Sequence, residues 1–104
     1  MNQQKIDWEK GNGLIPTIVQ EKSGEVLMLA YSTKESLKKT VQTKQGWYYS
    51  RSRKKLWRKG ETSGNTQKLK KVFVDCDKDT LLFQVEQKGN ACHLNKKNCF
   101  EEIK

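Results

Sequence analysis

"NGLIPTIVQEKSGEVLMLAY", residues 12–31, is the stretch that decides the fold class. Two runs of apolar and β-branched residues, 12–20 and 25–31, are typical of β-strands. Between them lies "EKSG", which has the length of a hairpin turn and offers Gly24 where positive φ is required. The stretch therefore predicts two strands joined by a tight turn.

A single helix follows this hairpin in the sequence. Residues 32–44, "STKESLKKTVQTK", place Leu37 and Val41 four positions apart, which is the spacing of one buried helix face. Ser32 is a candidate N-cap with Glu35 three residues later, the spacing of a capping box. We expect this to be the one main helix of the domain.

Strands dominate the rest of the chain. Apolar patterns predict strands at 47–51, 67–75 and 81–87, whereas 58–66 is a polar loop with two glycines and the tail is mostly loop. With the first hairpin, this gives about five strands and one helix. The predicted fold class is α+β and sheet-dominated, either a small mixed folded sheet or a pseudo-barrel.

Size and composition indicate one small domain, residues 1–104, with 34% hydrophobic residues. A domain of this size buries a modest share of its surface, so a second subunit or a metal ion would help to stabilise it. No run of about 18 apolar residues predicts a membrane span, and the N-terminus lacks the apolar core of a signal peptide. We therefore expect a cytoplasmic protein with no membrane partner.

The charge balance allows two interpretations. A net charge of +9, from 21 Lys and Arg against 12 Asp and Glu, indicates either a lysine-rich soluble surface or an anionic partner. Residues 48–66, "YYSRSRKKLWRKGETSGNT", interleave aromatic and basic side chains, which suits a nucleic acid or a single nucleotide. The hydroxyls and glycines of "GETSGNT" can bind phosphate, although no P-loop motif is present. A solvated basic hairpin is the alternative, with Trp57 in the core.

Three aspartates gather in "VDCDKDTLLFQVEQ", residues 74–87. If residues 75–79 are extended, Asp75, Asp77 and Asp79 share one face and Cys76 lies on the other. Three like charges repel one another unless a cation lies among them, and carboxylates suit Mg²⁺ or Ca²⁺. The alternative is a solvated acidic turn between two strands.

The three cysteines are Cys76, Cys92 and Cys99, an odd number that argues against a disulfide framework. Three thiolates with one open position make a plausible Zn²⁺ site, because catalytic zinc usually keeps three protein ligands and a water. His93, the one histidine, directly follows Cys92 and is either a fourth ligand or a base beside the metal. Three buried free thiols and a surface histidine are the alternative.

Long motifs resemble one known family. "LWRKGETSGNTQ" (56–67), "VDCDKDTLLFQVEQKGNACH" (74–93) and "NCF" (98–100) are similar to phosphoribosyl-AMP cyclohydrolase of histidine biosynthesis. The resemblance covers nearly the whole chain, from about residue 7 to residue 100. It implies that water adds to C6 of the purine ring of N1-(5-phosphoribosyl)-AMP and that the N1–C6 bond opens. It also implies a single-function form without a fused pyrophosphohydrolase domain.

The resemblance further implies an intertwined homodimer with two metals. The implied zinc ligands are Cys76, Cys92 and Cys99, contributed by both subunits at the interface. The implied magnesium ligands are Asp75, Asp77 and Asp79. In our mechanistic hypothesis, a zinc-bound water is the nucleophile, His93 is the proton shuttle, and magnesium helps to hold the substrate. The residues expected to bind the two phosphates are Arg51, Ser52, Arg53, Lys59, Thr62, Ser63 and Gly64.

Local departures from the family pattern spare these ligands. Ser32-Thr33 stands where the family usually has Met-Asn, Asn95 where it has glycine, and Asn98 where it has serine. A zinc-stabilised RNA-binding protein would also explain the charge, but three aspartates would repel a phosphate backbone. A deaminase-like hydrolase would need the H-x-E…P-C-x-x-C pattern, which is absent. We therefore expect a small phosphorylated nucleotide substrate and no nucleic acid.

Overall fold

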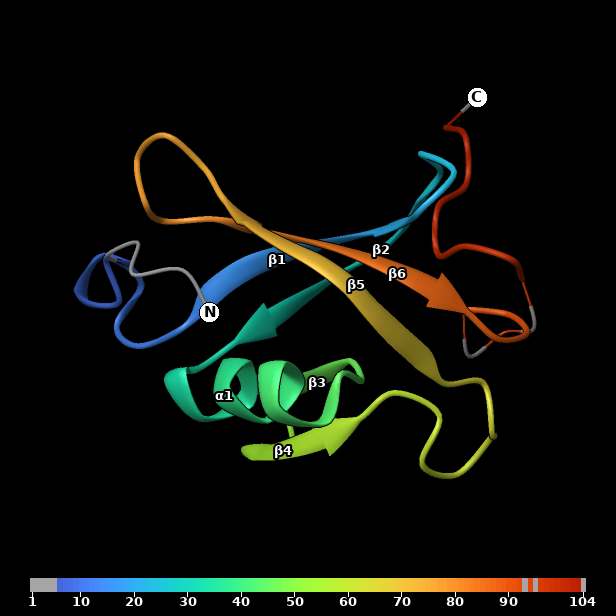
Figure 1. Cartoon of the computed structure of the whole chain (residues 1–104), viewed down its shortest axis with the longest axis horizontal. Coiled ribbons are helices and arrows are strands. Elements are labelled where there is room, and N and C mark those ends of the chain that lie inside the picture. The colour runs from blue at the N-terminus through green and yellow to red at the C-terminus, as the bar shows by residue number, and fades with distance from the viewer. Residues whose placement is uncertain (1–5, 93, 95, 104) are drawn as a thin grey trace.

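The computed structural model describes residues 6–92, 94 and 96–103. Its elements are the short 3-10 helix η1 (Glu9–Gly11), β1 (Ile15–Glu21), β2 (Val26–Ser32), α1 (Lys34–Thr43), β3 (Trp47–Ser50), β4 (Lys55–Arg58), β5 (Gln67–Val74) and β6 (Leu81–Gln87). Four strands form one sheet in the order β2-β1-β6-β5, and β3 pairs with β4 in a second sheet (Figure 1). The predicted sheet-dominated α+β class with one main helix is confirmed.

The hairpin predicted at residues 12–31 is confirmed as β1 and β2, which pair antiparallel. Gly24 in the turn has φ +110°, a conformation that a side chain would strain. Along β1 the side chains alternate, so that Ile15, Thr17 and Val19 are buried on the inner face of the sheet. The register of the hairpin thus fixes which face becomes the core.

The mixed character of the large sheet comes from β6. This strand pairs parallel with β1 and antiparallel with β5. It continues the inner face with Leu81, Phe83 and Val85, all of which are buried. The parallel pairing requires a long crossover, because parallel neighbours cannot be joined by a tight turn. The connection from β1 to β6 consists of β2, α1, β3, β4 and β5.

The helix forms as predicted, but its N-cap is Thr33 rather than Ser32. The Thr33 hydroxyl accepts a hydrogen bond from the Ser36 N–H at 3.1 Å, and the Ser36 hydroxyl accepts one from the Thr33 N–H at 2.9 Å. The expected pair of Ser32 and Glu35 is therefore wrong by one residue. Ser32 still belongs to β2, where its Oγ lies 2.6 Å from Thr17 Oγ1 in a buried hydrogen bond.

A strand inside the basic segment was not predicted. β4 pairs antiparallel with β3, with Trp57 opposite Tyr48. The charged residues of β4 leave it without an alternating apolar pattern, so only its pairing with β3 reveals it. The Trp57 ring packs 5.2 Å from the Tyr48 ring at the edge of the core, as predicted for this tryptophan.

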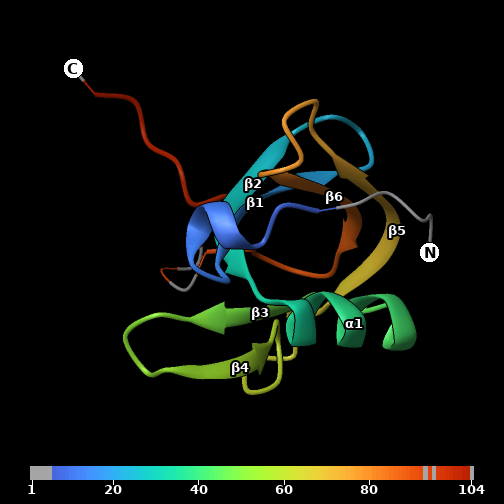
Figure 2. The same ribbon diagram turned by 90° about the vertical axis from the view of Figure 1, so that its left-hand side faces the viewer.

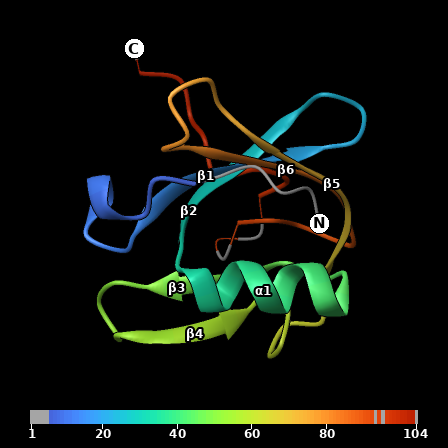
Figure 3. The same cartoon turned by 60° about the vertical axis from the view of Figure 1, so that its left-hand side comes forward.

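The core lies between two layers. Figures 2 and 3 show α1 and the β3–β4 hairpin side by side beneath the inner face of the four-stranded sheet. Tyr48 of β3 is fully buried and its ring lies 5.8 Å from that of Phe83 in β6. Of the two architectures predicted, the folded mixed sheet is observed, and the strands of the described residues do not close into a barrel.

The outer face of the large sheet carries a continuous apolar row. Leu29 of β2 pairs with Ile18 of β1, Ile18 pairs with Leu82 of β6, and Leu82 pairs with Phe73 of β5. Paired residues point to the same face, so these four side chains cross all four strands. Leu29 is 51% exposed and Phe73 43% exposed, so the row faces solvent in the isolated chain.

Candidate active site

The acidic segment between β5 and β6 is a turn, which is the alternative that the sequence left open beside an extended strand. The Asp75 N–H donates to the Thr80 carbonyl at 3.0 Å, and the Lys78 N–H donates to the Asp75 carbonyl at 3.1 Å. Lys78 has φ +64°, which reverses the chain direction. The strand alternation that would separate the aspartates from Cys76 in an extended segment therefore does not apply, and the alternative of a turn between two strands is observed.

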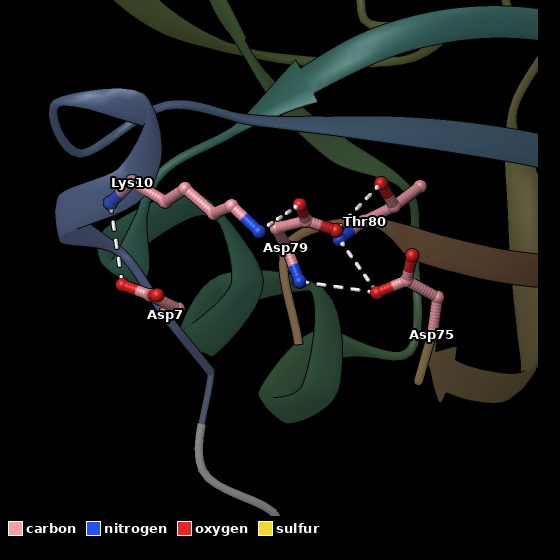
Figure 4. A network of polar contacts seen from close by, with 5 residues as sticks. All are labelled: Asp7, Lys10, Asp75, Asp79 and Thr80. Atoms are coloured by element: carbon pink, nitrogen blue, oxygen red, sulfur yellow. Dashed lines mark hydrogen bonds and ion pairs between the residues drawn. The ribbon is translucent and has the colours of Figure 1, made fainter. Parts of the chain in front are cut away.

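The turn brings the three carboxylates together. One oxygen each from Asp75, Asp77 and Asp79 lies within 4.8 Å of the others. Asp75 organises this arrangement, because its Oδ1 accepts hydrogen bonds from the Asp79 N–H at 3.1 Å and the Thr80 N–H at 3.3 Å (Figure 4). Three hard oxygen donors at this spacing fit the ligand preference of a divalent cation such as Mg²⁺.

Lys10 of η1 supplies a positive charge to this cluster. Its Nζ lies 2.9 Å from Asp79 Oδ2. This hydrogen bond, together with the charge of the ammonium, holds the pKa of Asp79 below its ordinary value. The Lys10 N–H also donates to Asp7 Oδ1 at 3.2 Å (Figure 4), and the Asp7 N–H donates to the Lys78 carbonyl at 2.7 Å, which ties the N-terminal segment to the acidic turn.

A surface pocket of about 560 Å³ adjoins the turn. Its wall combines the N-terminal segment, the start of α1 and the acidic turn, and its lining residues are Ile6, Asp7, Trp8, Glu9, Lys34, Asp77 and Lys78. A polar ligand that enters this pocket would therefore reach Asp77, the most exposed of the three aspartates.

Cys92 and Cys99 form a pair in the C-terminal segment. Cys92 is 7% exposed, whereas Cys99 is more accessible. Burial raises the pKa of the Cys99 thiol, and the charge and hydrogen bond of Cys92 raise it further, while the nearby Lys59 opposes them. A hydrogen bond of 2.7 Å from the Cys99 N–H to the Leu27 carbonyl fixes the pair beside β2.

Hydrogen bonds hold the segment around Cys92. The Leu94 N–H donates to Cys92 Sγ at 3.4 Å, which orients the sulfur. Backbone hydrogen bonds from Ala91 to Lys97 and from Cys92 to Lys96 close the loop. Thiolates are the ligands that zinc prefers, so this pair fits two positions of a zinc site.

Asn98 anchors the same loop. Its Nδ2 donates to Glu25 Oε2 at 2.9 Å, and Lys97 Nζ lies 3.0 Å from Glu25 Oε1. The hydrogen bond from Asn98 and the charge of Lys97 lower the pKa of Glu25. Asn98 thus ties the loop of Cys99 to the turn between β1 and β2.

Cys76 lies apart from the other two cysteines. It follows β5 at one edge of the sheet, whereas Cys99 lies beside β2 at the other edge, and Figure 1 shows these segments on opposite sides. The edge strands are roughly 14 Å apart at standard strand spacing. Within the described ranges, the three aspartates are the only group of three or more potential ligands. His93 and Asn95 lie outside the described residues.

The residues predicted to bind phosphate fall into two turns at opposite ends of β4. Arg51, Ser52 and Arg53 are exposed in the turn between β3 and β4. The Arg51 guanidinium lies 4.0 Å from the centre of the Tyr31 ring, a cation–π contact. The other predicted residues belong to the loop between β4 and β5; they are Lys59, Thr62, Ser63 and Gly64.

Comparisons with known proteins identify the family of this chain. A family model described as phosphoribosyl-AMP cyclohydrolase matches residues 28–101. A phosphoribosyl-AMP cyclohydrolase of Clostridium botulinum (strain 657 / Type Ba4) is 59% identical over 98 residues, which cover 93% of this chain and 89% of that protein. This chain belongs to the phosphoribosyl-AMP cyclohydrolase family.

Similarity within the phosphoribosyl-AMP cyclohydrolase family extends across distant organisms. The enzyme of Listeria innocua serovar 6a (strain ATCC BAA-680 / CLIP 11262) is 57% identical over 96 residues, covering 91% of this chain and 90% of that protein. That of Cenarchaeum symbiosum (strain A) is 56% identical over 97 residues, covering 92% and 90%. The region matched by the phosphoribosyl-AMP cyclohydrolase model contains every predicted metal ligand but not Lys10.

Two residues at this phosphoribosyl-AMP cyclohydrolase site were not predicted from the sequence. Lys10 is distant in sequence from the aspartates, and no pattern links them. Tyr31 belongs to β2, and no pattern marks it as the partner of Arg51. In the part of the chain that the structure describes, no helix is long and apolar enough to cross a bilayer.

Proposed function

We propose that this chain hydrolyses N1-(5-phosphoribosyl)-AMP at the N1–C6 bond of the purine ring, in histidine biosynthesis. Water supplies the oxygen that becomes the carbonyl at C6, and N1 keeps the electron pair of the broken bond and takes up a proton. The membership of the chain in the phosphoribosyl-AMP cyclohydrolase family carries this proposal. The cytoplasm remains the expected compartment.

Zinc is the proposed catalytic metal, held by Cys92 and Cys99 together with Cys76 of the partner subunit. The proximity of Cys92 to Cys99 supports the first two ligands, and the distant position of Cys76 in its own chain supports a third from elsewhere. When bound, zinc acts as a Lewis acid that makes water a nucleophile at neutral pH. His93 directly follows Cys92, and an imidazole with an ordinary pKa near 6.5 suits transfer of the proton.

A homodimer is proposed as the functional unit. The apolar row of Leu29, Ile18, Leu82 and Phe73 offers a contact surface on the outer face of the sheet. Such a solvent-facing row is stabilised when another apolar surface covers it. Since Cys76 and Cys99 are at opposite edges of this face, a second copy packed on it is the arrangement by which their sulfurs can meet.

Magnesium is the proposed second metal, with Asp75, Asp77 and Asp79 as ligands. The close approach of three carboxylate oxygens and the adjoining pocket support this assignment. Bound there, a divalent cation would neutralise the carboxylates and help to hold an anionic substrate. Lys10 would then exchange its contact with Asp79 for one with solvent or substrate.

Two turns divide the proposed phosphate-binding residues, and the substrate carries two phosphates, one on each ribose. β4 has four residues, so the turns at its ends lie roughly 10–13 Å apart along the strand. We assign one phosphate to the turn of Arg51, Ser52 and Arg53. The other belongs to the loop of Lys59, Thr62, Ser63 and Gly64, whose hydroxyls and backbone N–H groups suit phosphate.

Zinc content and turnover together test this function. We expect Cys92→Ala to lose zinc and hydrolysis of N1-(5-phosphoribosyl)-AMP, and His93→Ala to keep zinc and lose turnover. The matched control is Ala91→Ser, a small change at the neighbouring buried position that alters no metal ligand. Hydrolysis by Cys92→Ala without zinc would contradict the mechanism, and zinc loss in His93→Ala would make the histidine a ligand.

A further inference from the structure

A chain of buried polar side chains links three strands. The Tyr48 hydroxyl of β3 donates a hydrogen bond to Gln67 Oε1 of β5. Gln67 Nε2 in turn donates to Gln87 Oε1 of β6 at 2.8 Å. Tyr48 and Gln67 are fully buried, where leaving such groups without partners would be costly. Each group in this relay therefore fixes the orientation of the next.

The relay ends on the loop between β4 and β5. Gln87 Nε2 donates to the Asn65 carbonyl at 3.1 Å and to the Lys88 carbonyl at 3.0 Å, with the Thr66 carbonyl at 3.4 Å. The Lys88 N–H also donates to the Thr66 carbonyl at 2.9 Å. One half-buried amide thus holds the base of the loop against the end of β6.

Two glycines make this contact tight. A Cβ at Gly89 would lie 2.3 Å from Asn65 Oδ1, and one at Gly60 would lie 2.6 Å from the Asn65 carbonyl carbon. The loop base is therefore packed without spare room. In contrast, a Cβ at Gly64 would meet nothing within 4 Å, so the tip of the loop is open to a ligand.

The other end of the loop contacts the cysteine pair. Lys59 Nζ donates to the carbonyl of Ala91, the residue before Cys92. The loop therefore spans from the sulfur pair to the end of β6, so its position sets the distance between the proposed zinc and the proposed phosphate site.

We propose that Gln87 is a positioning residue that holds the loop of residues 59–66 in place for one substrate phosphate. Gln67 and Tyr48 orient Gln87, and its amide hydrogens orient the Asn65 and Lys88 carbonyls, whereas Gln87 itself touches no substrate. The inference rests on the proposed function of this loop. Loss of the amide hydrogens would let the loop base shift, so binding of the phosphate would suffer more than the chemical step.

Steady-state kinetics of Gln87→Met test this positioning role. We expect KM for N1-(5-phosphoribosyl)-AMP to rise about tenfold, the equivalent of about 1.4 kcal/mol, with kcat nearly unchanged. Gln87→Glu keeps the size and the acceptor for Gln67 but lacks the amide hydrogens, so it should show the same rise. Gln42→Met is the matched control, because it makes the same change at an exposed position of α1.

Binding of AMP, measured by calorimetry, gives a second readout that needs no turnover. We expect Gln87→Met to bind AMP about tenfold more weakly than the wild type, by the same conversion, and Gln42→Met to bind it equally well. A lower melting temperature of Gln87→Met with unchanged KM and AMP affinity would overturn the inference. So would wild-type behaviour of Gln87→Glu, or absence of AMP binding by the wild type. A wild type that binds AMP but fails to hydrolyse the substrate would instead overturn the proposed function.

Discussion

The Lys10 ammonium and the Asp79 carboxylate lie 2.9 Å apart, which joins an N-terminal helical turn to the acidic turn after β5. Each partner shifts the other: the pKa of Asp79 is lowered and the pKa of Lys10 is raised, in both cases chiefly by their hydrogen bond. The contact therefore has a defined pH window and competes with any divalent cation for the same oxygens.

Lys10→Met should lower the melting temperature of the metal-free protein at pH values between the titration of Asp79 and that of Lys10. A carboxyl whose folded pKa lies below its ordinary 3.8 stabilises the fold above that pH and loses this effect as pH falls. A lysine with a raised pKa contributes below its ordinary 10.5 and loses its effect above it. Lys38→Met, at an exposed position of α1, is the control. Thermal scans should separate the two variants near pH 7, and the difference should shrink as the pH falls below 3.8; equal melting of the two variants near pH 7 would contradict the role of the pair.

Asp77→Asn should remove the response to magnesium without disturbing the acidic turn. The turn depends on the hydrogen bonds of Asp75, whereas Asp77 is exposed and accepts none of those that define the turn. At a magnesium concentration 100 times the dissociation constant, binding stabilises the wild type by about 2.7 kcal/mol. Calorimetric scans with and without magnesium measure this gain, and Glu35→Gln controls for loss of a carboxylate. An unchanged gain in Asp77→Asn would exclude Asp77 as a ligand.

Gly46→Ala should destabilise the fold where the relay begins. A Cβ at this position would lie 2.4 Å from Gln67 Oε1 and 2.7 Å from the Tyr48 hydroxyl, both fully buried. Overpacking of this kind costs about 1–3 kcal/mol. At Gly11, by comparison, a Cβ would meet nothing within 4 Å. Urea unfolding should show the loss for Gly46→Ala and little change for Gly11→Ala, and equal stability of the two variants would show that the relay has room to shift.

Leu29→Lys should weaken the dimer by placing a charge in the apolar row. Leu29 is 51% exposed, so the isolated chain tolerates the lysine, whereas burial of that charge against a second copy is unfavourable. Ile103→Lys changes a side chain that is 96% exposed in the C-terminal segment and serves as the control. Light scattering coupled to size exclusion should report a monomer for Leu29→Lys and a dimer for Ile103→Lys. If Leu29→Lys remains a dimer and keeps its zinc, the dimer interface does not include the apolar row.

Elements defined by local pattern could be predicted from the sequence. The hairpin around Gly24 and the β6 strand have apolar runs and turn residues that determine their structure locally. β4 could not be predicted, because it is a strand only through pairing with β3, which residues 55–58 do not encode by themselves. The helix N-cap was predicted one residue too early. Ser32 can either cap the helix or extend the strand, and its hydrogen bond to Thr17 keeps it in β2.

The site shows the same division between local and distant information. The aspartates could be selected as a cluster from their spacing, but the sequence left open whether they extend a strand or form a turn, and the left-handed Lys78 makes the turn. Lys10, Gln67 and Gln87 could not be assigned from the sequence, because their partners lie far along the chain.

A zinc site shared by two subunits is the central claim, and mixing two inactive variants tests it most directly. Cys76→Ala and Cys92→Ala should each be inactive and lack zinc. Dissociated and reassociated in equal amounts, they should regain roughly a quarter of wild-type activity, because half the dimers are mixed and each has one complete site. Zinc recovered in the same proportion would support the shared site. If mixed dimers form but recover neither zinc nor activity, the three sulfurs do not meet across two chains, and the account is wrong.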